Sequence, residues 1–340
     1  MLSSASFSFI DPHQYQATLR AADVEFMIMA RGEFWAELTR IDLHRLWMQR
    51  GSQALPCVTH AKFHKDRCPI FFPADALQPP LQLSGKTVSP GDLIFHSPGA
   101  EHHHRFPAGC RWAAMSLTPE DLCVAGEALG YNLKAPAATL AVRPRPQLIA
   151  RLMTLHRAAG DLAAAAPEVL AHPEVARATE QALVHTMVAC LVDNQPIRSD
   201  YSRRQDAVIM RRFDGLIEEQ RDEPLYVLDV CAKLGVTART LRSYCHGHLG
   251  MGPHRYLWLR RMNLARQALA SADASTTTVT RIAMSYGFGE LGRFAVEYRK
   301  LFGEVPSATL HRSSDAVRLQ EIETSAHDFP FLHSRRPLFP

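Results

Sequence analysis

The sequence predicts an α+β chain, with a β-rich N-terminal part, a helical segment after it and a second, all-helical part beyond. Its 340 residues, 46% of them apolar, are enough for two or three domains. Short apolar runs broken by Gly and Pro fill residues 1–120, whereas the periodicity from about residue 121 is helical. The net charge of +4 is also divided unevenly: residues 224–312 contain 12 Lys and Arg against 5 Asp and Glu, a net of +7, which leaves −3 elsewhere.

Short strands are predicted throughout residues 1–120. The runs that predict them are FMIMA (26–30), FWAEL (34–38), LHRLWM (43–48) and DLIFHSP (92–98), with turn residues between them. Repeated short strands of this kind are typical of a small barrel or sandwich. We therefore expect an N-terminal β domain over residues 1–120.

Amphipathic helices are predicted over residues 121–196, where Ala and Leu recur at three- and four-residue spacing. Their apolar face is expected to form a dimer contact, and packing of the same face on the β domain is the alternative. The polar stretch 194–205 predicts a linker to a domain at 205–312. The remaining residues, 313–340, lack a sustained period and predict a loosely docked tail.

A motif occurs twice in the basic part of the chain. VCAKLGV (230–236) recurs 52 residues later as IAMSYGF (282–288), and each copy is followed by a second helical stretch and Gly-x-x-Pro. A short turn between two steeply crossing helices needs a residue that tolerates positive φ, the role of Gly235 and Gly287. The pattern therefore predicts two helix-turn-helix units, at about 228–249 and 280–302.

The second helix of each unit is predicted to lie in the major groove of double-stranded DNA, where such helices read bases. Thr237 is the expected N-cap of the first, and Gly289 takes the corresponding, weaker position in the second. The residues predicted to contact DNA are Arg239, Thr240, Arg242, Ser243 and His246 in the first unit and Glu290, Leu291, Arg293, Glu297 and Lys300 in the second. Arg239, Arg242 and Arg293 are the expected base readers, with phosphate contact or solvation as the alternative.

One long helix is predicted between the two units, over residues 253–271. Apolar residues recur along one face of it, and the opposite face carries Arg255, Arg260 and Arg266. Such a helix would hold the two recognition helices at the spacing of successive major grooves, about 34 Å.

These motifs resemble the AraC/XylS family of bacterial transcription regulators. TRIAMSYGFGELGRFAVEYRKLFGEVPSATLHR (280–312) is similar to the closing pattern of that family, and GMGPHRYLWLRRMNLARQAL (250–269) to its linker helix. One departure is Leu291-Gly292-Arg293, where the family commonly has a serine; Gly inside a helix costs about 1 kcal/mol relative to Ala. The resemblance implies a cytoplasmic, nucleoid-associated homodimer that regulates transcription, with RNA polymerase as a further partner.

The N-terminal part resembles a cupin-like sensor barrel, through VSPGDLIFHSPGAEHHHRF (88–106). The resemblance implies a binding site for a small-molecule effector, and the candidate ligand-binding residues are His60, His64, His96, His102 and His104. The stretch GEFWAELTRIDLHRLWMQRG (32–51) is similar to sensor halves in the family that include the ethanolamine-utilisation regulator, which implies a small polar metabolite as the effector. His102 and His104 would share one face of a strand. The His60-x-x-x-His64 spacing is helical or loop-like and lacks the HxH pair of catalytic cupins, so we expect no catalytic residue, no metal and no cofactor.

Two alternatives to a ligand-controlled regulator remain open. One is a cupin metalloenzyme with a helical assembly domain, and the other is a constitutive DNA-binding protein without a ligand. Seven widely spaced Cys without a CxxC pair predict reduced, packed thiols. The opening residues carry no basic leader, and no stretch reaches the roughly 18 apolar residues of a membrane span, so no membrane partner is expected.

Overall fold

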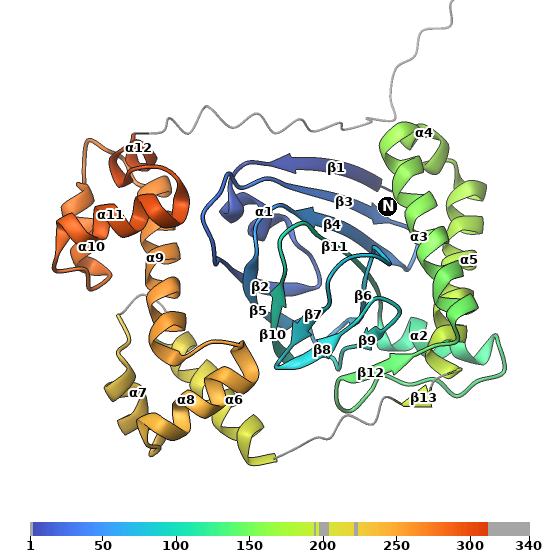
Figure 1. The fold of residues 1–340 in the computed structure, drawn as a ribbon. Helices are drawn as coiled ribbons and strands as arrows, with labels where there is room; N and C mark the ends of the chain where they lie inside the picture. The colour runs from blue at the N-terminus through green and yellow to red at the C-terminus, as the bar shows by residue number, and fades with distance from the viewer. Residues whose placement is uncertain (1–2, 194, 197–203, 221–223, 312–340) are drawn as a thin grey trace, which may run out of the picture.

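The computed structural model describes residues 3–193, 195–196, 204–220 and 224–311. Two antiparallel sheets form the N-terminal part, with helices on one side of them and the C-terminal helices on the other (Figure 1). This arrangement confirms the predicted α+β class, and the expected barrel or sandwich takes the form of two facing sheets. The tail at 313–340 and most of the expected linker lie outside the described residues.

The eight-stranded sheet has the order β1-β3-β4-β11-β6-β9-β12-β13, and the five-stranded sheet the order β2-β5-β10-β7-β8. The strands are β1 (Ser3–Phe9), β2 (Ala22–Ile28), β3 (Ala36–Asp42), β4 (Trp47–Gln53), β5 (Cys57–Phe63), β6 (Cys68–Pro73), β7 (Leu81–Leu83), β8 (Lys86–Val88), β9 (Leu93–Phe95), β10 (Glu101–Phe106), β11 (Cys110–Leu117), β12 (Leu140–Arg143) and β13 (Gln195–Pro196). Residues from both sheets, among them Phe26, Leu38 and Phe71, share one apolar core between the sheets.

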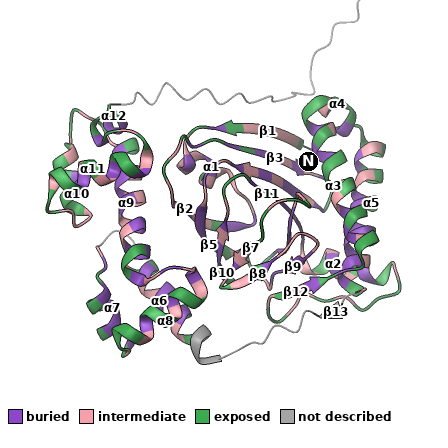
Figure 2. Cartoon of the chain, in the orientation of Figure 1, coloured by how far each residue is buried: buried purple, intermediate pink, exposed green. Residues whose placement is uncertain are grey.

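The helices of the N-terminal part are α1 (Pro12–Thr18), α2 (Pro119–Glu127), α3 (Pro146–Ala165), α4 (Pro167–Leu170) and α5 (Pro173–Val192). The apolar faces of α3 and α5 pack against the eight-stranded sheet, with Leu152 and Met187 fully buried, while their other faces are exposed (Figure 2). These faces are thus used within the chain, which is the alternative to a dimer contact. The segment 121–196 is also not wholly helical, because β12 adds a strand beside β9.

The C-terminal helices are α6 (Arg204–Glu219), α7 (Val227–Leu234), α8 (Ala238–Leu249), α9 (Pro253–Ser271), α10 (Val279–Ser285), α11 (Leu291–Phe302) and α12 (Pro306–Leu310). Their apolar core is continuous with Met27 and Val58 of the five-stranded sheet. The long helix α9 runs from one helical group to the other alongside β2, the edge strand of that sheet (Figure 1). Within the described part of the chain, no helix is both long and apolar enough to cross a membrane.

Candidate functional site

The first helix-turn-helix unit consists of α7 and α8. Gly235 ends α7 in the left-handed region, with φ of +67°, as its position in the motif predicts. The Thr237 side chain then caps α8 by accepting a hydrogen bond from the Thr240 backbone N–H at 3.1 Å. Leu241 and Cys245 point into the core. The first unit therefore has the glycine turn and the threonine cap that its sequence predicts.

The second unit, α10 and α11, differs at the start of its recognition helix. Gly287 has φ of +77°, as expected. The N-cap of α11 is Glu290 rather than Gly289, and the Glu290 side chain makes no capping hydrogen bond. Gly292 falls in the first turn of α11, where the cost of an interior helical glycine does not apply in full. Phe294 and Tyr298 form its buried face.

The outward residues of both recognition helices fall into two groups. Exposed are Arg239, Arg242, Ser243 and His246 in α8, Lys300 and Arg293 in α11, and Glu290 just before it. Thr240, Leu291 and Glu297 are half-buried. The Thr240 hydroxyl lies 2.8 Å from that of Thr237, and Glu297 pairs with Lys300 at 3.3 Å, so these two side chains already have partners within the chain. Contact of any of the ten with DNA stays a prediction.

The connecting helix α9 holds the two units together through Arg261. The Arg261 guanidinium lies over the ring of Tyr226, 5.1 Å from its centroid, and over that of Phe288, 5.3 Å away. Because Tyr226 precedes α7 and Phe288 follows α10, this cation–π pair of contacts joins both units to one side chain.

Two of the three arginines that α9 carries opposite its predicted apolar face are buried. Arg260 is 2% and Arg266 7% exposed, because the N-terminal part covers this face. Arg260 Nε lies 3.1 Å from Glu25 Oε1, and Arg266 Nη1 lies 3.2 Å from Asp11 Oδ2. The third, Arg255, is exposed and donates to the Met29 carbonyl at 3.3 Å. These arginines thus bind the N-terminal part to the C-terminal helices.

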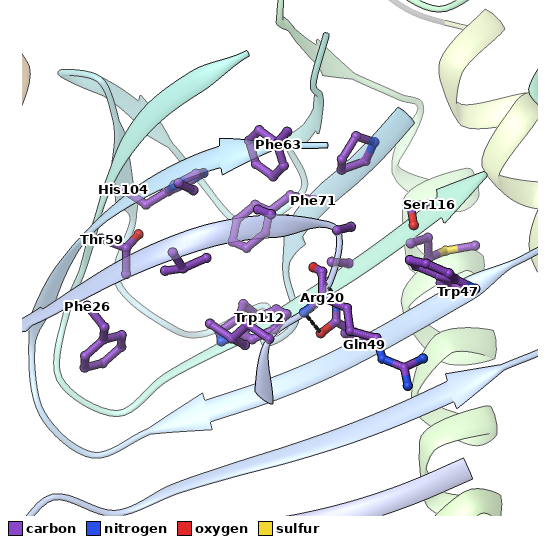
Figure 3. A pocket seen from close by; sticks show the side chains of 18 of the residues that line it. Arg20, Phe26, Trp47, Gln49, Thr59, Phe63, Phe71, His104, Trp112 and Ser116 are labelled. Carbon is purple, nitrogen blue, oxygen red and sulfur yellow. Dashed lines mark hydrogen bonds between the residues drawn. The ribbon is translucent and has the colours of Figure 1, made fainter. Parts of the chain in front are cut away.

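A cavity lies between the two sheets (Figure 3). The volume open to the centre of a water molecule is about 90 Å³. On the same measure a single water molecule needs roughly 10–15 Å³, so the cavity has space for more than one. Its wall is mainly apolar, with Phe26, Phe71 and Trp112 among the lining rings, and its polar side chains are Arg20, Gln49, Gln53, Thr59, His104 and Ser116. The Gln49 side chain exchanges two hydrogen bonds of 3.0 Å with the Arg20 backbone. The cavity therefore suits a small molecule that is mostly apolar.

The five predicted ligand-binding histidines do not form one site. Only His104 lines the cavity. The ring of His96 lies next to that of His104, with centroids 5.5 Å apart, and the ring of His102 lies next to that of His96, with centroids 5.3 Å apart. Burial lowers the pKa of His102 to about 4 and that of His104 to about 3, so both rings are neutral near pH 7. His64 is exposed, 3.7 Å from Asp23.

The remaining member, His60, lies on strand β5 rather than in a helix or loop, and it faces away from the cavity toward the C-terminal helices. There it meets His103, which sequence reasoning missed. The alternation along β10 could have placed His103, because it must face opposite to His102 and His104. Burial lowers the pKa of both His60 and His103, and it raises the pKa of the nearby Asp214. The three side chains present a set of donor atoms suited to a metal ion, although no metal site was expected.

Comparison with known proteins finds a family match in the C-terminal part of the chain. The family model described as a helix-turn-helix domain matches residues 230–312. The chain is 34% identical over 145 residues to the probable thc operon regulatory protein of Rhodococcus erythropolis, covering 42% of this chain and 44% of that protein. It is 38% identical over 82 residues to the XylDLEGF operon transcriptional activator of Pseudomonas putida, covering 24% of this chain and 26% of that one. The chain thus spans less than half the length of these two relatives.

Among solved structures, the AraC-like transcriptional activator CuxR aligns over 77% of this chain and 96% of its own, at 17% identity and a TM-score of 0.39. The residues that the family model matches, 230–312, include both glycine turns and both recognition helices. Residues 230–312 of the chain match the model of a helix-turn-helix domain family, and the chain is similar to proteins named as an operon regulatory protein and an operon transcriptional activator.

Proposed function

We propose that this chain is a sequence-specific DNA-binding transcription regulator whose N-terminal cavity binds a small-molecule effector. The observation that carries the proposal is the pair of helix-turn-helix units joined by α9, each with an exposed arginine, Arg242 or Arg293, in its recognition helix. Bidentate arginine contacts to guanine are the commonest specific base contacts in the major groove. The proposed nucleic-acid partner is double-stranded DNA.

The strands of the five-stranded sheet support a route from effector to DNA. In β2, Phe26 lines the cavity and its neighbour Met27 packs into the core of the C-terminal helices. In β5, Thr59 likewise lines the cavity, and its neighbour Val58 packs into the core of the C-terminal helices. A ligand that shifts these strands therefore acts on both faces, and it favours whichever arrangement of the two parts it binds better. The apolar wall favours a small, mainly apolar effector over the small polar one that the sequence suggests.

Two further partners, a second copy of the chain and RNA polymerase, rest on the family resemblance, as does a place in the cytoplasm. The relatives' names describe regulatory proteins, which supports a regulator rather than an enzyme. Of the two alternatives, the constitutive DNA-binding protein differs from our proposal only in lacking an effector. A thermal-shift screen of small metabolites separates them, because a ligand at 100 times its dissociation constant adds about 2.7 kcal/mol to stability.

The decisive experiment is selection of binding sites from random duplex DNA by the full chain, followed by affinity measurements at several salt concentrations. We expect a defined sequence and a linear fall of log affinity with log salt, with a slope of about −0.9 for each phosphate contacted. The matched control is the same chain with Arg239, Arg242 and Arg293 replaced by Ala. Salt-independent binding, or equal binding by this triple variant, would contradict the proposal.

A further inference from the structure

Three polar side chains lie in a row across the outer face of the five-stranded sheet. The strand register pairs Glu25 of β2 with His60 of β5, and His60 with His103 of β10. Directly opposite residues on adjacent strands point to the same side of a sheet. The rings of His60 and His103 stack, with centroids 4.7 Å apart and an interplanar angle of 24°. Two imidazoles are therefore held side by side where the C-terminal helices cover the sheet.

Helix α6 contributes a carboxylate to the same place. Asp214 Oδ1 lies 3.6 Å from His103 Nε2. One ring nitrogen from each histidine and one carboxylate oxygen of Asp214 all lie within 4.8 Å of one another. Asp214 is 8% and His103 4% exposed. The three donor atoms thus converge in a buried space between the N-terminal sheet and the C-terminal helices.

Two of these side chains have polar atoms that the protein leaves unsatisfied. His60 Nε2 and Asp214 Oδ1 are inaccessible to solvent and have no hydrogen-bond partner among the described residues. Burying a polar atom without a partner is unfavourable, and such atoms in a native structure call for a partner such as a water molecule or an ion. Asp214 Oδ1 faces His103 Nε2 at 3.6 Å, and His60 Nε2 lies 4.0 Å from Glu101 Oε2, beyond hydrogen-bond distance.

We propose that His60, His103 and Asp214 bind a divalent transition-metal ion, and that this ion joins the N-terminal sheet to α6. Two imidazoles with one carboxylate is a donor set that suits Zn²⁺, usually completed by a water molecule. With metal–ligand distances of about 2.1 Å, tetrahedral donors lie about 3.4 Å apart. The His103–Asp214 pair is already near that separation at 3.6 Å, and a donor nitrogen of His60 lies within 4.8 Å of both partners.

Two further carboxylates surround the cluster. The Glu25 carboxylate stands next to His60 in the row and pairs with Arg260 Nε at 3.1 Å, while Glu101 Oε2 lies 4.0 Å from His60 Nε2 and Glu101 Oε1 pairs with Lys62 at 3.4 Å. Because both carboxylates already have a cationic partner, the carboxylate of Asp214 is the group that would offset the charge of the ion. The Tyr256 hydroxyl, 3.2 Å from His103 Nε2, is a further oxygen at the site. Metal binding would move this contact, since His103 Nε2 would become a ligand.

The position of the site gives it a regulatory role. His60 and His103 lie on β5 and β10, and their chain neighbours Thr59 and His104 line the cavity on the other face. The ion would thus lie between the effector cavity and the DNA-binding helices, and would favour the arrangement in which the two are docked. Binding of metal is independent of the proposed function, whereas its effect on DNA affinity depends on it.

The first test is a titration of the full, chelator-treated chain with Zn²⁺, with metal per chain measured by equilibrium dialysis. We expect one ion per chain, and at least a tenfold weaker affinity in Asp214→Asn and in His60→Gln. Asp214→Asn preserves the shape of the side chain, and circular dichroism verifies that each variant is folded. His64→Gln, which changes an exposed histidine outside the cluster, is the matched control and should bind as the unaltered chain does.

A spectroscopic arm identifies the ligands directly. Co²⁺ in place of Zn²⁺ should give the visible absorption of a tetrahedral site in the unaltered chain and in His64→Gln, and not in Asp214→Asn. The proposal is overturned if the unaltered chain binds no ion at micromolar concentration, or if Asp214→Asn and His60→Gln bind as it does.

The second test compares affinity for the selected DNA with and without Zn²⁺. We expect at least a threefold change in the unaltered chain and none in Asp214→Asn. Equal affinities in both, with Zn²⁺ bound, would overturn the regulatory role and leave the metal site. Failure of every variant to bind DNA would count against the proposed function, and the dialysis result would still decide the metal site.

Discussion

The side-chain amide of Asn263 forms hydrogen bonds with both the backbone N–H and the backbone carbonyl of Ile28. Asn263 Oδ1 accepts a hydrogen bond from the Ile28 N–H at 3.1 Å, and Asn263 Nδ2 donates to the Ile28 carbonyl at 3.4 Å. Because β2 is an edge strand of its sheet, these backbone groups face away from β5 and would otherwise lack a strand partner. The amide of one side chain on α9 thus stands in for a neighbouring strand and fixes the connecting helix to a wall of the cavity.

We expect Asn263→Ala to loosen the contact between the two parts of the chain. Both backbone groups of Ile28 lose a partner, which should lower stability by about 1–2 kcal/mol. The measurement is urea unfolding, together with hydrogen exchange at the Ile28 amide, which should speed up selectively. Gln267→Ala, one turn further along α9, is the control and should leave that amide protected. Unchanged exchange at Ile28 in Asn263→Ala would show that the pairing does not hold in solution.

The local parts of this fold could be predicted from the sequence. Helix α9 occupies the predicted residues, Pro253–Ser271, because proline at the first helical position and the apolar spacing both act within the segment. Gly235 and Gly287 adopt the positive φ that their motif requires, for the same reason. A single sequence thus predicts the features that depend only on residues close together in the chain.

Contacts between distant segments could not be predicted in the same way. The partner of Arg260 is Glu25, 235 residues earlier in the chain, and nothing in the spacing around Arg260 distinguishes a buried arginine from a solvated one. The grouping of His60 with His103 depends on the register of β5 against β10, which sequence alone does not give. The sequence therefore groups His60 with His102 and His104, although His60 lies on the opposite face of the five-stranded sheet.

Arg242→Ala should weaken binding to the selected DNA by about 1–3 kcal/mol, and the loss should fall at one base pair if Arg242 contacts a base edge. Affinities for single-base variants of the site measure this. A uniform loss across all sequences, with the salt slope smaller by about one phosphate, would make Arg242 a phosphate contact instead. Arg299→Ala, an exposed arginine in the last turn of α11 and outside the predicted contacts, serves as the control.

Gly51→Ala should disturb the cavity wall. A Cβ at Gly51 would overlap the indole of Trp112, which lines the cavity and donates from Nε1 to the Tyr15 hydroxyl at 3.0 Å. The ring must shift, so stability should fall by about 1–3 kcal/mol in urea unfolding. If the overlap is the cause, Gly51→Ala should cost much less in a Trp112→Leu background, and a double-mutant cycle measures the difference. Equal costs in both backgrounds would assign the effect to the strand itself.

Acid should destabilise the fold through buried neutral histidines, and His156 offers a test of one of them. His156 lies between α3 and the eight-stranded sheet, with its ring edge-on to Phe72, and burial lowers its pKa from 6.5 to about 4. The unfolded chain therefore binds a proton below pH 6.5 that the folded chain does not bind until about pH 4. Stability contributed by the neutral ring is full above pH 6.5 and is lost as the pH falls toward 4.

The size of this loss follows from the same shift. One pKa unit corresponds to about 1.4 kcal/mol, so the His156 contribution between pH 7 and pH 5 is on the order of 2 kcal/mol. In His156→Gln, urea unfolding should show a pH dependence smaller by about one proton over that range, because Gln can also donate to the Ala114 carbonyl, 3.4 Å from His156 Nε2, yet does not titrate. His185→Gln on the exposed side of α5 should keep the full dependence. If the two variants unfold with the same pH dependence, the His156 ring is not buried in its neutral form, and the packing of α3 against the sheet differs from the one described.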